Sequence, residues 1–130
     1  MTTQLVVVTP DETVRQVRRR LRRDRLHAAE IDGIVVVDSD GKLAGDIPLF
    51  EFAIATNDST VTALLPKGEA VSVSVDAGIT EVAERLVDTR HSSVVVVDEL
   101  NRPVGRILAD DLLDALMPDR GRRRFPRFLS

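Results

Sequence analysis

The sequence predicts an α+β fold in which two β-α-β-β-α units pack as a pseudo-twofold pair. A run of β-branched residues, a polar turn and a second apolar run occur at 34–47 and again at 93–107. Such runs, bounded by turn residues, are typical of buried strands. The flanking segments repeat as well, so the chain is a duplicated unit. One unit of this size has too little core to fold alone, and the two copies are therefore expected to cover each other's sheets.

The duplication is visible as two blocks that align without gaps. Val6–Leu21 matches Val71–Leu86 at an offset of 65, and Ile34–Ala55 matches Val94–Ala115 at an offset of 60. The first copy therefore has five extra residues between its helix and its hairpin. These matches place the first unit at 1–60, the second at 61–119, and a basic, disordered tail at 120–130.

The first copy is expected to begin with a strand at 5–8 and a helix that starts near Thr13. The apolar residues Val14, Val17 and Leu21 have the i, i+3, i+7 spacing of a helix face. Thr9 or Asp11 is the expected N-cap, because hydroxyl and carboxylate side chains accept hydrogen bonds from the first turn. Strands at 34–37 and 43–47 and a helix that opens at Pro48 complete the copy.

The second copy repeats this order. A strand is expected at 70–75, and the helix at 79–89 shows a clear 3.6-residue apolar period. The hairpin of residues 93–107 follows. A final helix at 109–117 is expected to end before Pro118 and Gly121.

Composition and charge narrow the classes of function. The chain has 43% hydrophobic residues and no cysteine, which excludes disulfides and thiolate sites. No apolar run approaches the roughly 18 residues of a membrane-spanning helix, so a cytoplasmic location is expected, including the cytosolic face of a membrane. The net charge of −3 divides into +4 over 1–27, −12 over 28–119 and +5 over 120–130. This asymmetry predicts self-association, an anionic partner or a nearby membrane surface; the alternative is a solvated helix face and tail.

The hairpins carry the same pattern of polar residues in both copies. These are Asp38, Gly41, Lys42 and Gly45 in the first copy, and Asp98, Asn101, Arg102 and Gly105 in the second. With the β-α-β-β-α order and a helix that opens three residues after the glycine, the chain resembles a tandem pair of CBS (cystathionine-β-synthase) domains, or Bateman module, over about residues 5–117.

Four further stretches are similar to the cytosolic CBS region of MgtE-type magnesium transporters: Thr13–Arg23 with the long loop that follows it, Ala55–Val61, Leu64–Lys67 and Asp110–Leu116. The resemblance implies a non-catalytic regulatory module that senses an adenine nucleotide or Mg²⁺. It also implies a homodimer whose partner is a transporter membrane domain or another regulated protein.

The resemblance places a nucleotide, AMP or ATP, in a cleft between the copies. Gly45 and Gly105 lead to the ribose-binding acid positions, which are Glu51 and Asp111, and His91 and Ser92 would contact the adenine. The hydroxyl position of the family's pattern is Pro48 in copy one and Leu108 in copy two, which favours AMP, adenosine or no ligand over ATP. The alternative is that both acids only complement a helix dipole.

Magnesium is the other candidate ligand. Mg²⁺ prefers oxygen ligands and keeps several waters, so clustered carboxylates suffice. Asp110 and Asp114 are four residues apart and face one way, while Asp111 and Asp114 match acidic positions that bind Mg²⁺ in the transporter family. The alternative is an acidic, solvated helix end.

No catalytic constellation stands out. The sequence has no nucleophile elbow, P-loop or zinc-ligand spacing, which favours a protein that is not an enzyme. Two other interpretations remain: a dimerisation module with a degenerate ligand site, and an anionic-surface or nucleic-acid binder that uses the Arg-rich tail. Nucleic acid is the least favoured partner.

Overall fold

The computed structural model describes residues 5–24, 31–68 and 70–116, with side chains as far as Leu112. The first copy contains β1 (Val6–Val8), α1 (Val14–Arg23), β2 (Gly33–Val37), β3 (Leu43–Pro48) and α2 (Leu49–Ile54). The rest contains α3 (Val61–Leu64), β4 (Ser72–Ser74), α4 (Ile79–Thr89), β5 (Ser93–Val97), β6 (Pro103–Leu108) and α5 (Ala109–Leu116). The predicted tail at 120–130 lies outside the described residues.

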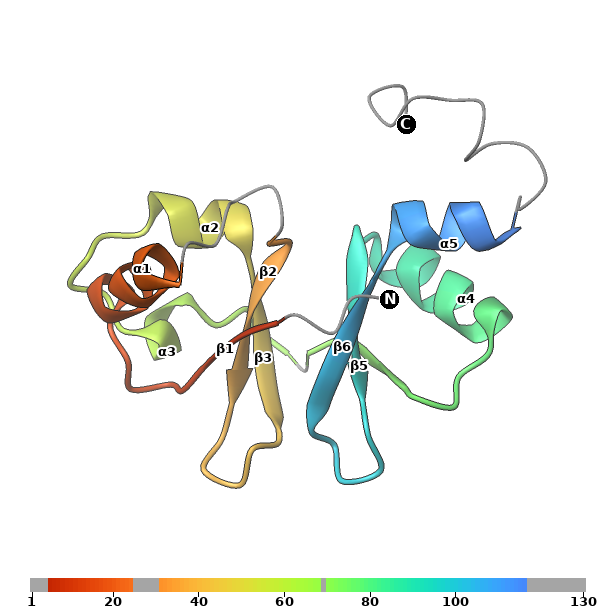
Figure 1. Cartoon of the computed structure of the whole chain (residues 1–130), viewed down its shortest axis with the longest axis horizontal. Helices are drawn as coiled ribbons and strands as arrows, with labels where there is room; N and C mark the ends of the chain where they lie inside the picture. Colours follow the sequence, from red (N-terminus) through yellow and green to blue (C-terminus); the bar gives the residue numbers. More distant parts are fainter. Residues whose placement is uncertain (1–4, 25–30, 69, 117–130) are drawn as a thin grey trace.

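The strands form two sheets of three, in the orders β1-β2-β3 and β4-β5-β6. In each sheet the first strand pairs in parallel with the second, and the second and third form an antiparallel hairpin. The sheets lie next to each other in the middle of the molecule and the helices lie on their outer sides (Figure 1). The predicted fold class is confirmed.

Both hairpins have the same irregular turn. The register shifts between Val36 and Val37 in one copy and between Val96 and Val97 in the other. Gly41 and Asn101 occupy equivalent turn positions with φ of 79° and 63°. Glycine and asparagine are the residues that adopt this left-handed conformation most readily, which explains the glycine-or-asparagine pattern of the sequence.

Helix α1 begins directly after Thr13, as expected, but neither of the expected residues caps it. Thr13 is the N-cap: its hydroxyl accepts a hydrogen bond from the Gln16 backbone N–H at 3.2 Å, and the Gln16 side chain accepts from the Thr13 N–H at 2.9 Å. The prediction of Thr9 or Asp11 was wrong, because this reciprocal capping box satisfies two backbone donors and a cap at either earlier residue would not. Thr9 instead donates its N–H to Glu12 at 2.8 Å.

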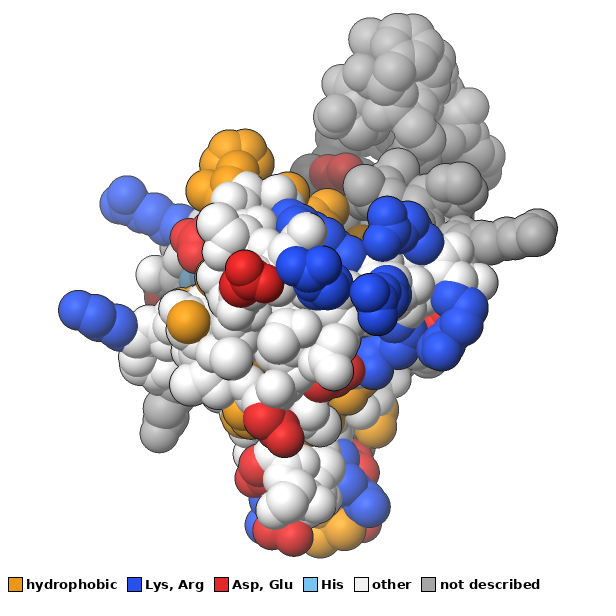
Figure 2. Space-filling view, turned by 90° about the vertical axis from the view of Figure 1, so that its left-hand side faces the viewer, with side chains coloured by type: hydrophobic (Ala, Val, Ile, Leu, Met, Phe, Trp, Pro, Cys, Tyr) orange, Lys and Arg blue, Asp and Glu red, His pale blue; other side chains and the backbone are white. Residues whose placement is uncertain are grey.

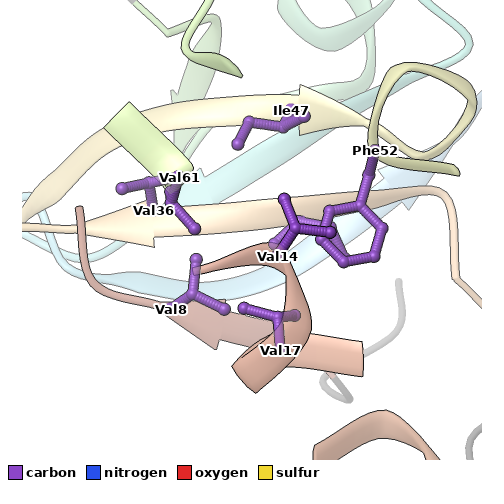
Figure 3. Close-up of a cluster of buried hydrophobic side chains, with 8 residues drawn as sticks. Val8, Val14, Val17, Val36, Ile47, Phe52 and Val61 are labelled. Carbon is purple, nitrogen blue, oxygen red and sulfur yellow. The ribbon is translucent and has the colours of Figure 1, made fainter. Parts of the chain in front are cut away.

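Each sheet packs its outer face against its own helices. Eight side chains form the first core: Val8, Val14, Val17, Ile34, Val36, Ile47, Phe52 and Val61 (Figure 3). The second core contains Val73, Val82, Leu86, Val94 and Val96. Val61 comes from α3, which the sequence suggested as the start of the second unit, yet its side chain is fully buried in the first core.

A third cluster joins the two sheets. Along β2 the side chains alternate, so that Ile34 and Val36 face the helices while Val35 faces the other sheet. Val95 and Val97 of β5 meet Val35 there. The expectation that the two copies bury each other's sheets therefore holds in the described structure, and the alternation of strand side chains explains it.

No helix within the described ranges has both the length and the apolar character needed to cross a membrane.

Candidate functional site

A cleft of about 170 Å³ opens where the two copies meet. It is smaller than the roughly 300–1,000 Å³ typical of pockets for drug-sized ligands. Its lining residues are Asp32, Gly45, Asp46, Pro48, Pro66, Lys67, Gly68, Ala70, Val71, His91, Ser92, Ser93 and Arg106. Both copies and the segment between them contribute, so the cleft exists only in the paired module.

The register of the two hairpins brings two charged side chains into this cleft. Asp46 pairs with Val35, and Arg106 pairs with Val95. Residues directly opposite each other on paired strands point to the same face of a sheet. Because Val35 and Val95 face the opposite sheet, Asp46 and Arg106 do so too, and they meet between the sheets.

Asp46 and Arg106 form a bidentate ion pair. The distances are 2.7 Å from Nη2 to Oδ1 and 3.0 Å from Nη1 to Oδ2. The Arg106 side chain is 5% exposed and that of Asp46 is 21% exposed. A planar guanidinium opposite a carboxylate is the strongest side-chain pairing available, and the low exposure leaves it little screened by solvent.

The pair belongs to a larger polar network. Arg106 also donates to the Ser93 hydroxyl at 2.7 Å and lies 3.8 Å from the Asp32 carboxylate. Asp32 accepts hydrogen bonds from the hydroxyls of Ser92, at 3.3 Å, and of Ser93. Asp32 and Asp46 come from the first copy and the other three residues from the second, so the network ties the copies together.

The formal charges of the Asp, Lys and Arg side chains that line the cleft cancel. Asp32 and Asp46 are negative, and Arg106 and Lys67 are positive. The Arg106 charge is already matched by carboxylates, whereas Lys67 is exposed and lies in no ion pair among the described residues. The polar groups of the cleft therefore offer hydrogen bonds to a neutral ligand, and Lys67 offers a place for one small anionic group. Pro48, Pro66, Ala70 and Val71 supply apolar surface beside these groups.

The structure brings together only some of the predicted ligand residues. Gly45, His91 and Ser92 all line the cleft. Glu51 and Asp111 are exposed in the first turns of α2 and α5 and are not among its lining residues, and Gly105 is buried within β6.

The predicted magnesium ligands lie on α5. Asp110 and Asp111 are both exposed in its first turn. The side chain of Asp114 lies outside the described residues. Among the side chains that are described, no three His, Cys, Asp or Glu residues gather closely enough to hold a metal ion.

Sequence reasoning missed the residues that dominate the cleft, namely Asp32, Asp46, Lys67, Ser93 and Arg106. A signal for two of them was present. Asp46 and Arg106 are equivalent at the offset of 60, stand in otherwise apolar strands and have opposite charges. Opposite charges at equivalent inward positions of two paired copies indicate a cross-copy ion pair.

Comparisons with known proteins agree with the architecture. The model of the CBS domain family matches residues 1–55 and 61–118. The magnesium transporter MgtE of Thermus thermophilus is 38% identical over 89% of this chain, and MgtE of Enterococcus faecalis is 29% identical over 89%. The matches cover 26% and 25% of those proteins, so this chain spans about a quarter of their length.

Solved structures show the same fold. The cytosolic domain of the Mg²⁺ channel MgtE, solved in complex with ATP, superposes with a TM-score of 0.79 at 36% identity. The match covers 88% of this chain and 46% of that one. The CBS pair of a putative Mg²⁺ transporter from Shewanella oneidensis gives a TM-score of 0.73 at 19% identity, covering 89% and 66%, which supports the fold alone. The chain belongs to the CBS domain family and is a tandem CBS pair related to the cytosolic CBS region of MgtE magnesium transporters.

Proposed function

We propose that this CBS pair is a non-catalytic regulatory module that binds AMP or adenosine in the cleft between its copies. The proposal is supported mainly by the cleft itself, which is lined by a satisfied polar network and by apolar residues. A nucleobase needs apolar surface together with a few placed hydrogen-bond partners, and both are present. The ATP complex of the related MgtE cytosolic domain supports an adenine ligand.

The charge of the cleft favours a ligand with few phosphates. Arg106 is held by Asp46 and lies near Asp32, so its charge is not free to bind a triphosphate. Among the described lining residues, Lys67 is the cation left for one phosphate, and His91 also lines the cleft. Asp32 and Asp46 would repel additional phosphates. The order of affinity that follows is AMP above adenosine, with ATP weaker than AMP.

Ligand binding would act on the relative position of the two copies. A ligand in this cleft touches residues from both, and it therefore favours the arrangement in which both contacts are made. In a longer parent protein the regulated partner would be a magnesium-transporting membrane domain, and the module would lie in the cytoplasm at the membrane face.

A second candidate function is dimerisation without ligand sensing. Phe50 and Ile54 lie four residues apart on α2 and are 75% and 70% exposed. Large apolar side chains exposed together indicate an interaction surface. In that case the chain forms a homodimer, and the cleft only connects the two copies and binds no ligand.

A thermal-shift titration separates the two candidates. Adenosine, AMP and ATP are added separately, with Mg²⁺ alone as a fourth arm that tests Asp110, Asp111 and Asp114. A ligand that binds only the folded state raises the melting temperature as its concentration exceeds Kd. Stabilisation by AMP supports the regulatory function. Dimerisation with no shift from any of the three adenine compounds supports the second candidate and contradicts the first.

A further inference from the structure

Helices α1 and α4 are equivalent elements that share their buried positions. At the offset of 65, Val17 matches Val82 and Leu21 matches Leu86. Val17, Val82 and Leu86 are buried in the cores, and Leu21 packs against the first core. Folding therefore explains the residues on the inner faces of the two helices.

The outer faces differ in a way that folding does not require. Arg19 matches Glu84, and Arg23 matches Asp88. All four side chains are exposed. Because an exposed helix position tolerates most charged residues, the core leaves the sign of the charge open. The opposite signs at both pairs of positions are therefore available for a role outside folding.

The basic surface consists of Arg15, Arg19, Arg22 and Arg23 on the outer side of α1. Figure 2 shows positive side chains gathered on the end of the molecule that carries this helix. Arg15 and Arg23 make only exposed ion pairs, with Asp58 at 3.1 Å and with Asp24 at 3.3 Å. In the described part of the chain, Arg19 and Arg22 lie within ion-pair distance of no acidic side chain.

A shallow hollow lies within this basic surface. Arg19 and Arg23 line it together with Glu12, Gln16 and Arg20. The Arg20 charge is engaged by Glu12 at 3.0 Å and by the Val7 carbonyl at 2.9 Å. The hollow thus presents two guanidinium groups, from Arg19 and Arg23, to an incoming anionic side chain.

The acidic surface consists of Glu81, Glu84 and Asp88 on the outer side of α4. Their spacing of three and four residues places them on one helix face. None of the three forms an ion pair with the residues that the structure describes. Val87 lies beside them and is 73% exposed, which adds apolar area to the same side.

The two surfaces cannot meet within one molecule. Figure 1 places α1 and α4 at opposite ends of the long axis, with both sheets between them. We propose that the basic surface of α1 binds the acidic surface of α4 on a second copy of this chain. Arg19 and Arg23 have the same i, i+4 spacing as Glu84 and Asp88, so the two charge rows match in length.

This contact joins unlike ends and is heterologous. Each association leaves one basic and one acidic end free, so assembly continues beyond a dimer unless the rotation closes a ring. Exposed ion pairs are individually weak and are screened by salt. The association therefore depends on several pairs acting together and falls as ionic strength rises. It does not depend on a ligand in the cleft.

Sedimentation velocity at low and high ionic strength tests the proposal with two charge-reversed variants. The first, Arg19→Glu with Arg23→Glu, makes the facing charge rows of both helices acidic; the second, Glu84→Arg with Asp88→Arg, makes both rows basic. Controls of the same charge change lie on the hairpin turns: Lys42→Glu with Arg102→Glu, and Asp40→Arg with Glu99→Arg. All of these side chains are exposed.

The native chain and both controls should show mass beyond a dimer that is lost at high salt. Each reversed variant alone should associate about tenfold more weakly or worse, since attraction becomes repulsion. An equimolar mixture of the two variants should recover the association, because each supplies the charge that the other lacks. The proposal is overturned if the native chain shows no mass beyond a dimer at low salt, or if the mixture of the two variants does not recover the association. Loss in the α1 variant alone, together with its loss of binding to anionic vesicles or DNA, assigns the surface to another partner and overturns it as well.

Discussion

Arg106 and Asp46 occupy equivalent positions in the two copies and form a bidentate ion pair across the interface between the sheets. A true twofold repeat would place like residues there, and the pair exists because the copies have diverged to opposite charges. It holds the walls of the cleft at a fixed separation. The ion pair also neutralises the Arg106 guanidinium, which would otherwise be available to bind a polyphosphate.

Removal of Asp46 should be strongly destabilising. Asp46→Ala leaves the Arg106 guanidinium, 5% exposed, without its main partner. Breaking a buried pair costs about 3–5 kcal/mol, and the lower end applies because Asp46 is one-fifth exposed. The double variant Asp46→Leu with Arg106→Leu should cost less than Asp46→Ala alone, since no charge is left unpaired. Urea unfolding measures both, and a double variant worse than the single one contradicts this account.

A side chain at the position of Gly33 should crowd the same ion pair and destabilise the fold. A Cβ at this position would lie 2.7 Å from the Asp46 carboxylate oxygen, 3.1 Å from Arg106 Nη2 and 3.1 Å from the Ile47 carbonyl oxygen. Gly33→Ala should therefore destabilise the fold by about 1–3 kcal/mol through crowding. Gly78→Ala is the matched control, because a Cβ there meets no atom within 4 Å. Equal stability of the two variants in urea would show that the crowding is relieved without cost.

Arg18 should be a structural arginine, in contrast to its neighbours on α1. Its guanidinium donates to the carbonyls of Phe52, Ala53 and Ala55 at 3.3, 3.0 and 2.9 Å, and lies 5.6 Å from the Phe52 ring centroid. Hydrogen bonds from a charged donor contribute about 1.5–3 kcal/mol, so Arg18→Ala should cost that order. Arg15→Ala, which removes one exposed ion pair, should cost at most about 1 kcal/mol. Thermal unfolding of both variants checks the difference.

The turn at Asp98 should contribute stability that depends on pH. The backbone N–H of Arg102 donates to Asp98 at 2.9 Å and is the main cause of the lowered pKa of this carboxyl, aided by the N–H of Leu100 and the Arg102 charge. A folded-state pKa below the unfolded value means that the stabilisation is present above about pH 4 and is lost as the pH falls through the folded pKa. Asp98→Asn keeps the turn geometry without this titration. In urea unfolding from neutral to acid pH, the native chain should lose its advantage over Asp98→Asn at the acid end. A difference that stays constant with pH would contradict the assignment.

The duplication made most of the fold predictable. Alternating valines such as Val35 and Val36 set the two faces of each sheet, and α4 begins and ends at its predicted residues. The helix cap and the contacts of the short helix α3 were harder to predict. Thr13 is the N-cap although Thr9 or Asp11 was expected, because Thr13 forms a reciprocal pair of hydrogen bonds with Gln16. Val61 joined the first core because α3 hydrogen-bonds to Glu12, a long-range contact that periodicity does not encode.

The site was less predictable than the fold for a physical reason. A cleft is lined by residues from several separated segments, and the alignment of the copies indicates equivalence but not which equivalent residues meet. His91 and Ser92 were predicted because the resemblance to CBS pairs implies adenine contacts from the loop before β5. Lys67 was missed because it lies in the segment between the copies, which has no counterpart in the matched blocks.

Lys67 provides the most direct test that the cleft binds a nucleoside monophosphate. Isothermal titration calorimetry with AMP and with adenosine would use the native chain, Lys67→Ala and Lys42→Ala, the last being an exposed lysine on the first hairpin turn outside the cleft. Loss of one exposed charge-assisted contact should weaken AMP binding about 3–30-fold and leave adenosine binding within about twofold. Lys42→Ala should match the native chain for both ligands. Failure of the native chain to bind either ligand, or equal AMP affinity in Lys67→Ala and the native chain, would contradict the account.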